Sequence, residues 1–339
     1  AETQEYTLLK FWCEAQQLYL VAATLRPETV FGQVCFWVRP DIEYVKIRKG
    51  EETWVVSAQA AEKLALQMDG ITVIGKVSGK SMIGWLCRAP MLHKLIPVFP
   101  AAFVDPDVGT GLVTSVPSDA PDDWDSLEKI KQDPALHAEY GLSQELIDSV
   151  KPVSIISIDG YGEFPAQSII ERMKIAATVK APEKFRELMD EAKKQVYKDG
   201  YHLGRMKEAC GAYAGLRVEE AKDRMKQAML DSGEAELFRD LTEEVVCRCG
   251  RRVHIKRIDD QWFIDYGNAE LTAKSTMTTS AVSWTGSGSG PASGWATGWA
   301  PSSRSTRSGP SRPSPIRRST RCTTRSPCTP TKAGSGQNR

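Results

Sequence analysis

The first 115 residues are short apolar or alternating stretches separated by turn residues, and this pattern limits the possible folds most. Residues 6–11 and 17–23 predict one hairpin, and residues 44–48 and 52–56 predict a second. Further strands are expected at residues 34–38, 71–77 and 95–99. This part has many strands but one expected helix, over residues 57–68 with Ser57 as its cap. It therefore predicts a closed or nearly closed β-barrel.

The rest of the chain alternates between helical and extended patterns, so the class expected for the whole is α+β. One helix is expected to open at Pro121, a residue type suited to a first helical position, with Ser118 or Asp119 as its cap. Further helices are predicted at residues 143–149, 166–173, 183–198 (ending before Gly200) and 218–230. Strands are predicted at residues 112–116, 153–158, 243–246, 253–258 and 260–266.

A strand that breaks into a proline-stiffened loop is the first candidate for a site. The apolar stretch 18–23 is interrupted at Arg26, which precedes a proline and is therefore driven out of the helical region. Thr24 and Thr29 flank the break, and such a loop can present hydroxyls to a small ligand. An ordinary strand followed by an ordinary turn explains the same composition.

A second candidate is the pair of acids at the helix that begins with Pro121. Asp122 and Asp123 follow a glycine-rich turn at residues 109–111 and the apolar stretch 112–116. Acids in the first turn of a helix complement its dipole, so their presence alone does not indicate a site.

Charge and cysteine content limit the partners and the compartment. Residues 275–339 carry eight Arg, one Lys and no acid, which leaves 35 basic against 43 acidic residues before them. A body with a net charge near −8 is not a general nucleic-acid adhesive, so any RNA contact must be local. The eight cysteines are scattered, with no secretory signal and no long apolar run. A cytosolic, reduced, soluble protein without a membrane span is therefore expected.

Cys247 and Cys249 are spaced like half of a zinc site. No second pair follows, and His254 alone cannot complete four ligands. The sequence therefore predicts two thiols on a hairpin and no metal.

Taken together, residues 23–29, 109–123 and 260–267 resemble the editing insertion of leucyl-tRNA synthetases of the eukaryotic cytosolic and archaeal type. The opening stretch 4–10 resembles the entry strand of the same insertion. The resemblance runs in order over residues 1–274. It implies an editing domain with helical insertions at residues 1–259 and an exit strand toward a synthetic domain at residues 260–274. Valyl enzymes have a similar threonine-rich segment but a histidine-containing stretch where this chain has residues 118–121, so a valyl-type editing domain is the less favoured alternative.

The resemblance implies a β-barrel surrounded by helices that hydrolyses the ester between a wrong amino acid and the tRNA 3′ end. Such a second site is needed because a synthetic pocket discriminates close aliphatic relatives by only about 1–3 kcal/mol. By resemblance, Thr29 excludes leucine sterically and Asp123 binds the substrate ammonium group. Thr24 would orient the attacking water or the terminal adenosine, and Arg26 could contact its phosphate.

The resemblance also adds Leu112 and Ser115 as substrate-binding residues. The expected partners are the 3′ end of tRNA(Leu) and mischarged aliphatic amino acids, with no membrane, a monomeric state and a cytoplasmic location. Editing is expected to need no cofactor, because positioned water and substrate hydroxyls suffice. ATP would serve only a synthetic domain, whose two signature motifs this sequence lacks. A non-catalytic tRNA-binding fragment remains the alternative function.

The tail at residues 275–339 is rich in Ser, Thr, Gly, Pro and Arg, which is typical of a disordered basic segment. Shifting residues 301–326 by one reading frame permits a run that contains L-S-D-S-T-I-Y, which resembles the family's return into the synthetic domain. A frame-shifted tail without a selected function is therefore an alternative hypothesis. The source transcript across Lys274 would decide it, and an uninterrupted frame would refute it.

Overall fold

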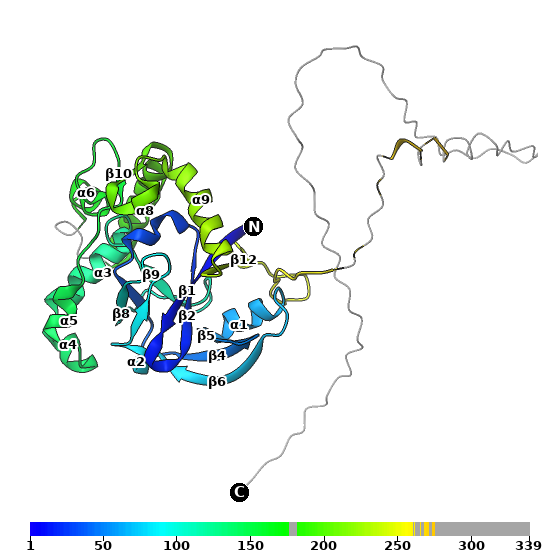
Figure 1. Ribbon diagram of the computed structural model, residues 1–339, viewed down its shortest axis with the longest axis horizontal. Helices are drawn as coiled ribbons and strands as arrows, with labels where there is room; N and C mark the ends of the chain where they lie inside the picture. Colours follow the sequence, from blue (N-terminus) through cyan, green and yellow to red (C-terminus); the bar gives the residue numbers. More distant parts are fainter. Residues whose placement is uncertain (176–181, 260, 262–264, 266–267, 271–272, 275–339) are drawn as a thin grey trace, which may run out of the picture. The chain divides into compact units, whose positions relative to one another are not determined.

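The computed structural model describes residues 1–175, 182–259, 261, 265, 268–270 and 273–274 (Figure 1). The chain divides into two units, residues 1–262 and residues 263–339, and the fold described below is that of the first. The expected tail, and most of the expected exit strand at 260–266, lie outside the described residues.

One mixed sheet organises the first unit. Its strands are β1 (Thr3–Cys13), β2 (Leu18–Thr24), β3 (Cys35–Val38), β4 (Glu43–Lys49), β5 (Glu52–Val56), β6 (Thr72–Ser78), β7 (Leu86–Arg88), β8 (Leu95–Pro100), β9 (Val113–Ser115) and β12 (Ala235–Leu241). The order is β6-β4-β5-β2-β1-β7-β8-β3-β9, with β12 beside β1. A separate two-stranded sheet joins β10 (Ile156–Ser157) to β11 (Arg205–Met206).

The expected closed barrel is not confirmed, because the sheet is open. Among the described residues, β6 and β9 form the two ends of the pairing order and do not pair with each other. The long strand β1 explains why ten strands do not form a simple series. Its first part pairs with β12, from Thr3 opposite Leu241 to Leu9 opposite Ala235, and Trp12 pairs with Arg88 of β7. The sequence pattern locates strands, but it does not specify which of them pair.

Both faces of β1 are buried, which accounts for its nearly continuous apolar run. Leu9 and Phe11 point into the largest core cluster, whereas Tyr6 and Leu8 belong to a second cluster with Trp54 of β5. Because side chains alternate along a strand, a strand covered on both sides must be apolar at successive positions.

The helices are α1 (Ala58–Ala65), α2 (Gly79–Met82), α3 (Pro121–Gln132), α4 (Pro134–Tyr140), α5 (Gln144–Ser149), α6 (Pro165–Arg172), α8 (Pro182–Leu203) and α9 (Val218–Asp231). Three 3₁₀ segments, η1 (Glu14–Gln16), η2 (Pro27–Gly32) and η3 (Glu208–Tyr213), complete the described elements. In Figure 1, α3, α6 and α8 lie together on one side, and α1 lies on the side of β4 to β6. Residues of α3 and α5 share a third core cluster with β3 and β8, so this helical layer fixes the position where α3 begins.

Several sequence expectations hold. Ser57 caps α1 by accepting a hydrogen bond from the Ala60 N–H at 3.1 Å. Helix α9 buries the expected stripe of Val218, Ala221, Met225 and Met229.

Other expectations are wrong for identifiable reasons. Neither Ser118 nor Asp119 caps α3, because the Ser118 hydroxyl donates to the Asp119 carboxylate instead. Helix α8 continues through Gly200, which is buried against other elements, so packing outweighs the weak helix propensity of glycine. The expected strand at 153–158 is reduced to β10, and the hairpin expected at 243–258 retains one bridge, between Val246 and Arg252.

The expectation that all the cysteines are reduced is also corrected. Buried Cys13 and Cys87, on the adjacent antiparallel strands β1 and β7, form a disulfide, and Cys247 forms another with Cys249. Within the described ranges, Cys35 and Cys210 are free and buried. The described part contains no cluster of potential ligands that could hold a metal. Its helices include none with the length and apolar character required to cross a membrane.

Candidate functional site

The loop after β2 is held by its two threonines. The Thr24 hydroxyl accepts a hydrogen bond from the Arg26 N–H at 3.0 Å, and the Thr29 hydroxyl donates to the Arg26 carbonyl oxygen at 2.9 Å. Thr29 is 6% exposed and lies in η2, which begins at Pro27. Both candidate hydroxyls therefore contact the same backbone unit, and the position of Arg26 is coupled to both.

The glycine-rich turn at residues 109–111 packs directly against the end of β2. The Thr110 hydroxyl accepts a hydrogen bond from the Ala23 N–H at 3.1 Å. Gly109 has a φ of +58°, and a Cβ there would lie 2.7 Å from the Cβ of Ala23. The turn thus needs glycine both for its backbone conformation and for its close approach to the threonine loop.

Strand β9 follows this turn and contains Ser115, while Leu112, the other substrate-binding residue predicted here, lies directly before it. Leu112 and Ser115 are buried, and Ser115 pairs across the sheet with Cys35 of β3. The neighbouring Thr114 points to the opposite face of the strand. Its hydroxyl oxygen and Oε1 of Gln33 have no hydrogen-bond partner within the described part of the chain. Buried polar atoms without partners are rare in proteins, so these two oxygens are sites at which a ligand or water could bind.

Asp123 lies in the first turn of α3 and has two protein donors. Oδ1 accepts from the Trp37 indole N–H at 2.9 Å, and Oδ2 accepts from the Val116 N–H at 2.7 Å. Burial raises the pKa of Asp123 to about 7, although both donors favour the charged form and lower it. A carboxyl group with this pKa can gain or lose a proton near neutral pH, which is common at functional sites.

Asp123 is linked to the threonine loop through Val116. The backbone of Val116 donates to Asp123, and its side chain lies against Gly32 at the end of η2, where a Cβ would be 2.8 Å from Val116 Cγ1. Burial raises the pKa of the Tyr197 phenol on α8, whereas the nearby charge of Arg26 lowers it and that of Asp123 raises it further, so this ring lies near both groups. The structure therefore brings together two of the sequence motifs, residues 23–29 with Thr24 and Thr29 and residues 109–123 with Asp123. Most of the third motif, residues 260–267, lies outside the described residues.

Arg26 points inward rather than to solvent. Its Nε lies 3.0 Å from Oε1 of Glu28, and its guanidinium carbon lies 4.4 Å from the centre of the Tyr197 ring. The guanidinium already has protein partners, and 17% of the side chain is exposed. A phosphate contact by Arg26 would require this arrangement to change.

Sequence reasoning assigned no site role to three residues of this region: Trp37, Asp119, which was expected only as a helix cap, and Tyr197. Asp119 is buried near Arg26, and its desolvation raises its pKa to about 6. Trp37 and Tyr197 lie on separate elements with ordinary core-like patterns. The sequence offers no local signal for them, because their roles depend on which side chain they face.

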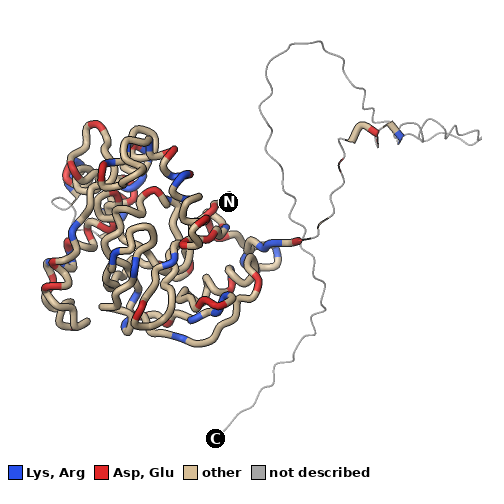
Figure 2. The backbone as a smooth tube through the Cα atoms, in the orientation of Figure 1, with Lys and Arg blue, Asp and Glu red and all other residues tan. Residues whose placement is uncertain are grey.

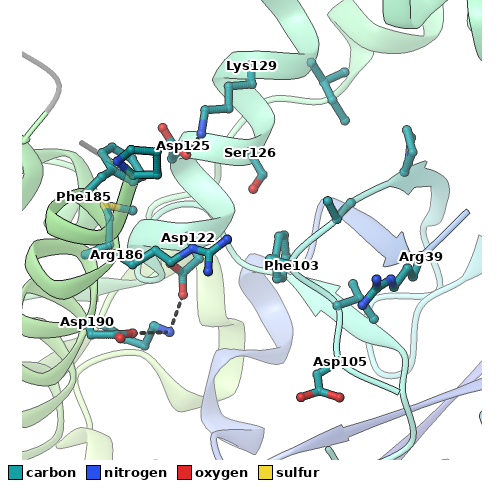
Figure 3. A pocket seen from close by; sticks show the side chains of 18 of the residues that line it. Arg39, Phe103, Asp105, Asp122, Asp125, Ser126, Lys129, Phe185, Arg186 and Asp190 are labelled. Atoms are coloured by element: carbon teal, nitrogen blue, oxygen red, sulfur yellow. Dashed lines mark hydrogen bonds and ion pairs between the residues drawn. The ribbon is translucent and has the colours of Figure 1, made fainter. Parts of the chain in front are cut away.

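A cavity of about 970 Å³ lies beside α3 (Figure 3). None of the predicted site residues lines it, but Asp122 does, and Lys193 forms ion pairs with Asp122 and Asp190, as the dashed lines show. Phe103 in its wall packs edge-on against Trp37, with ring centres 6.0 Å apart. Trp37 in turn donates to Asp123, so two aromatic side chains connect the cavity to that carboxylate. Figure 2 shows acidic and basic residues interspersed along the first unit, without one dominant sign.

Comparison with known proteins identifies the fold and the family. No protein-family profile matches the chain. A solved structure described as GlLeuRS-CP1 matches with a TM-score of 0.61 at 28% identity, over 69% of this chain and 98% of the other. The editing domain of the P. knowlesi cytosolic leucyl-tRNA synthetase matches with a TM-score of 0.59 at 20% identity, over 70% of this chain and 97% of the other. The fold is that of a synthetase editing domain.

Sequence relatives specify the family. The leucine–tRNA ligase of Pyrococcus abyssi is 39% identical over 278 residues, and that of Methanosarcina acetivorans is 40% identical over 274 residues. Each alignment covers 80% of this chain. The chain belongs to the leucine–tRNA ligase family and corresponds to its editing domain, as the sequence resemblance implied. It spans 28% of the Pyrococcus enzyme and 27% of the Methanosarcina enzyme.

Proposed function

We propose that this chain hydrolyses the ester bond of tRNA(Leu) charged with a wrong aliphatic amino acid. The observation that carries the proposal is the convergence of the motifs at residues 23–29 and 109–123. The threonine loop is hydrogen-bonded to the turn that contains Thr110, and Val116 links the same region to Asp123. The substrate is the charged 3′ end of the tRNA, and the protein that acts on it is a cytoplasmic monomer.

The roles follow from the chemistry of each side chain. Asp123 in its charged form binds the substrate ammonium group, and its helix-start position keeps that carboxylate fixed. Thr29 crowds the branched end of leucine and so protects correctly charged tRNA, while Thr24 orients the attacking water or the terminal adenosine. Leu112 and Ser115 shape the wall behind them. Hydrolysis then proceeds by water attack on the ester carbonyl, with no covalent enzyme intermediate, no cofactor and no ATP.

A tRNA-binding module without catalysis is the second candidate, and one observation favours it. Both oxygens of Asp123 already accept protein hydrogen bonds, and the residue is 6% exposed, as expected for a carboxylate that serves the fold alone. In the catalytic alternative, the ammonium group adds to these donors, because each carboxylate oxygen can accept more than one hydrogen bond.

Deacylation of isoleucyl- and norvalyl-tRNA(Leu) by the full chain separates the two candidates. Hydrolysis that exceeds the buffer rate and is lost in Asp123→Ala supports the editing enzyme. Binding of the charged tRNA without hydrolysis would support the module instead. Leucyl-tRNA(Leu) serves as the matched substrate that should survive.

A further inference from the structure

We propose that Tyr197 on α8 is a positioning residue that sets the leucine discrimination of Thr29 by holding Arg26. This inference deepens the proposed function and rests on it. The juxtaposition that carries it is a tyrosine ring on a helix from the second half of the chain, lying against the arginine at the centre of the threonine loop.

The arginine side chain is held on two sides. The Tyr197 ring lies under the guanidinium, with 4.4 Å from the guanidinium carbon to the ring centre, and Glu28 lies at 3.0 Å from Nε. Glu28 is 1% exposed, and its Oε2 has no hydrogen-bond partner in the described residues. A buried carboxylate with a single cation nearby depends strongly on that cation, so Glu28 and Tyr197 together favour one position of Arg26.

The shape of α8 permits this contact. Gly200 lies three residues after Tyr197 on the same helix, and a Cβ at Gly200 would lie 3.8 Å from Nη2 of Arg26. Residues three apart face the same side of a helix, so the ring and the glycine form one surface that contacts the guanidinium. This explains why α8 continues through a residue at which the sequence predicts its end.

The position of the Arg26 side chain is transmitted to both candidate hydroxyls. Thr24 accepts from the Arg26 N–H and Thr29 donates to the Arg26 carbonyl, so a shift of this residue moves both threonines. Steric exclusion of leucine depends on the position of one branched side chain, and small displacements are enough to reduce it. Loss of the ring should therefore affect discrimination more than the hydrolysis of a wrong amino acid.

The contrasting explanation is that Tyr197 only fills space, because it also packs against the large core cluster. Two substitutions separate the explanations. Tyr197→Phe keeps the ring face beside Arg26, whereas Tyr197→Leu fills much of the volume without an aromatic face. Tyr201→Leu is the matched control one turn further along α8, because the Tyr201 ring lies near Lys222, with 5.5 Å from Nζ to the ring centre, instead of Arg26.

The first measurement compares hydrolysis of leucyl- and isoleucyl-tRNA(Leu) by the full chain. We expect Tyr197→Leu to hydrolyse the leucyl ester about tenfold faster than the wild type, which is the scale of a desolvated cation–π contact. Its rate on the isoleucyl ester should stay within about twofold of the wild-type rate. Tyr197→Phe and Tyr201→Leu should retain wild-type discrimination. Thermal unfolding checks that each variant folds, and Tyr197→Met replaces Tyr197→Leu if the latter does not.

The second measurement does not need activity. Phenylglyoxal modification of Arg26, followed by peptide mass spectrometry, should be slow in the wild type, in Tyr197→Phe and in Tyr201→Leu, and faster in Tyr197→Leu. An inactive wild type with a protected Arg26 would overturn the proposed function while leaving the contact intact. An active wild type whose Tyr197→Leu variant still spares leucine, or whose Arg26 reacts equally in all variants, would overturn the role of Tyr197.

Discussion

The indole nitrogen of Trp37 lies 2.9 Å from Oδ1 of Asp123, so a tryptophan of β3 supplies a hydrogen bond to the predicted ammonium-binding carboxylate. This donor stabilises the charged form of a side chain that burial otherwise favours as the neutral acid. Because Trp37 also packs against Phe103 in the cavity wall, this hydrogen bond connects the protonation state of Asp123 to that wall.

Removing this donor should move the pH dependence of deacylation. A hydrogen bond to a charged group contributes about 1.5–3 kcal/mol, so Trp37→Phe should raise the pKa of Asp123 by roughly one unit or more. The variant should lose activity near pH 7 and recover it at higher pH, relative to the wild-type profile. Asp123→Asn should show no such recovery, and equal pH profiles for Trp37→Phe and wild type would contradict the assignment.

Changing the shape of the side chain at position 29 tests whether Thr29 excludes leucine sterically. Thr29→Ala removes the branched side chain, so leucyl-tRNA(Leu) should become a substrate, with a rate increase of about tenfold or more, the scale expected for one or two methyl-sized groups. Thr29→Val keeps the branch but loses the hydrogen bond to the Arg26 carbonyl, so it should exclude leucine better than Thr29→Ala but less well than the wild type. Deacylation assays on the two variants give the answer directly. If Thr29→Ala still spared leucyl-tRNA(Leu), another residue would have to exclude leucine.

Folding stability should fall as the pH rises through the weakly acidic range. Burial raises the pKa of Asp123 to about 7 and that of Asp119 to about 6, from an ordinary value of 3.8. The native state therefore keeps protons that the unfolded chain releases. The contribution of these groups is largest below their unfolded pKa and is lost as the pH rises to about 7.

Urea unfolding between pH 4.5 and 8 measures this effect. Asp123→Asn and Asp119→Asn should each show a smaller fall in the free energy of unfolding than the wild type over this range. The difference between wild type and variant cancels the titration of all other groups. If both variants showed the same dependence of the unfolding free energy on pH as the wild type, the raised pKa values of Asp123 and Asp119 would be contradicted.

The close approach of Gly109 to Ala23 predicts a localised stability loss. Gly109→Ala combines an unfavourable positive φ with a contact of 2.7 Å. Gly70→Ala is the matched control, because Gly70 has a φ of +73° but nothing within 4 Å of the added Cβ. The free energy of unfolding should fall by about 1–3 kcal/mol more in Gly109→Ala than in Gly70→Ala, the usual range for overpacking. Equal losses in chemical denaturation would mean that the turn can move away from β2.

The disulfide between Cys13 and Cys87 should be detectable and stabilising. Peptide mapping without reductant should recover these two residues linked, with Cys35 as a free thiol. The bond closes a loop with a sequence separation of 74 residues, so reducing it should lower the free energy of unfolding by about 2–4 kcal/mol. Cys13→Ala should lose most of this dependence on reductant, because the remaining disulfide joins residues with a sequence separation of only 2. Free Cys13 in the unreduced protein would refute the pairing.

Local chemistry could be predicted from the sequence where it is encoded by neighbouring residues. Ser57 caps α1 and the β4–β5 hairpin forms as expected, because each depends on nearby residue types. The threonine loop was found for the same reason, since a proline after a strand marks its end.

Features that depend on distant partners could not be predicted. The strand order of the open sheet depends on the pairing partners of β1, and one of these, β12, is distant in the sequence. The length of α8 depends on the packing of Gly200 beside Arg26, and the setting of Asp123 depends on Trp37, many residues away. None of these pairs leaves a periodic pattern in the sequence.

The pairing of β1 with β12 has a consequence for how such a fold can be attached to a larger protein. Thr3 lies opposite Leu241, so the strand that enters the body and the strand that closes it run antiparallel, side by side (Figure 1). A body held in this way can be attached to a larger protein by two adjacent strands, which leaves the flanking segments of the host close together. Because Tyr6 and Leu8 of β1 share a core cluster with Phe238 of β12, a change in the direction of these two strand ends would reorient the first unit as one body.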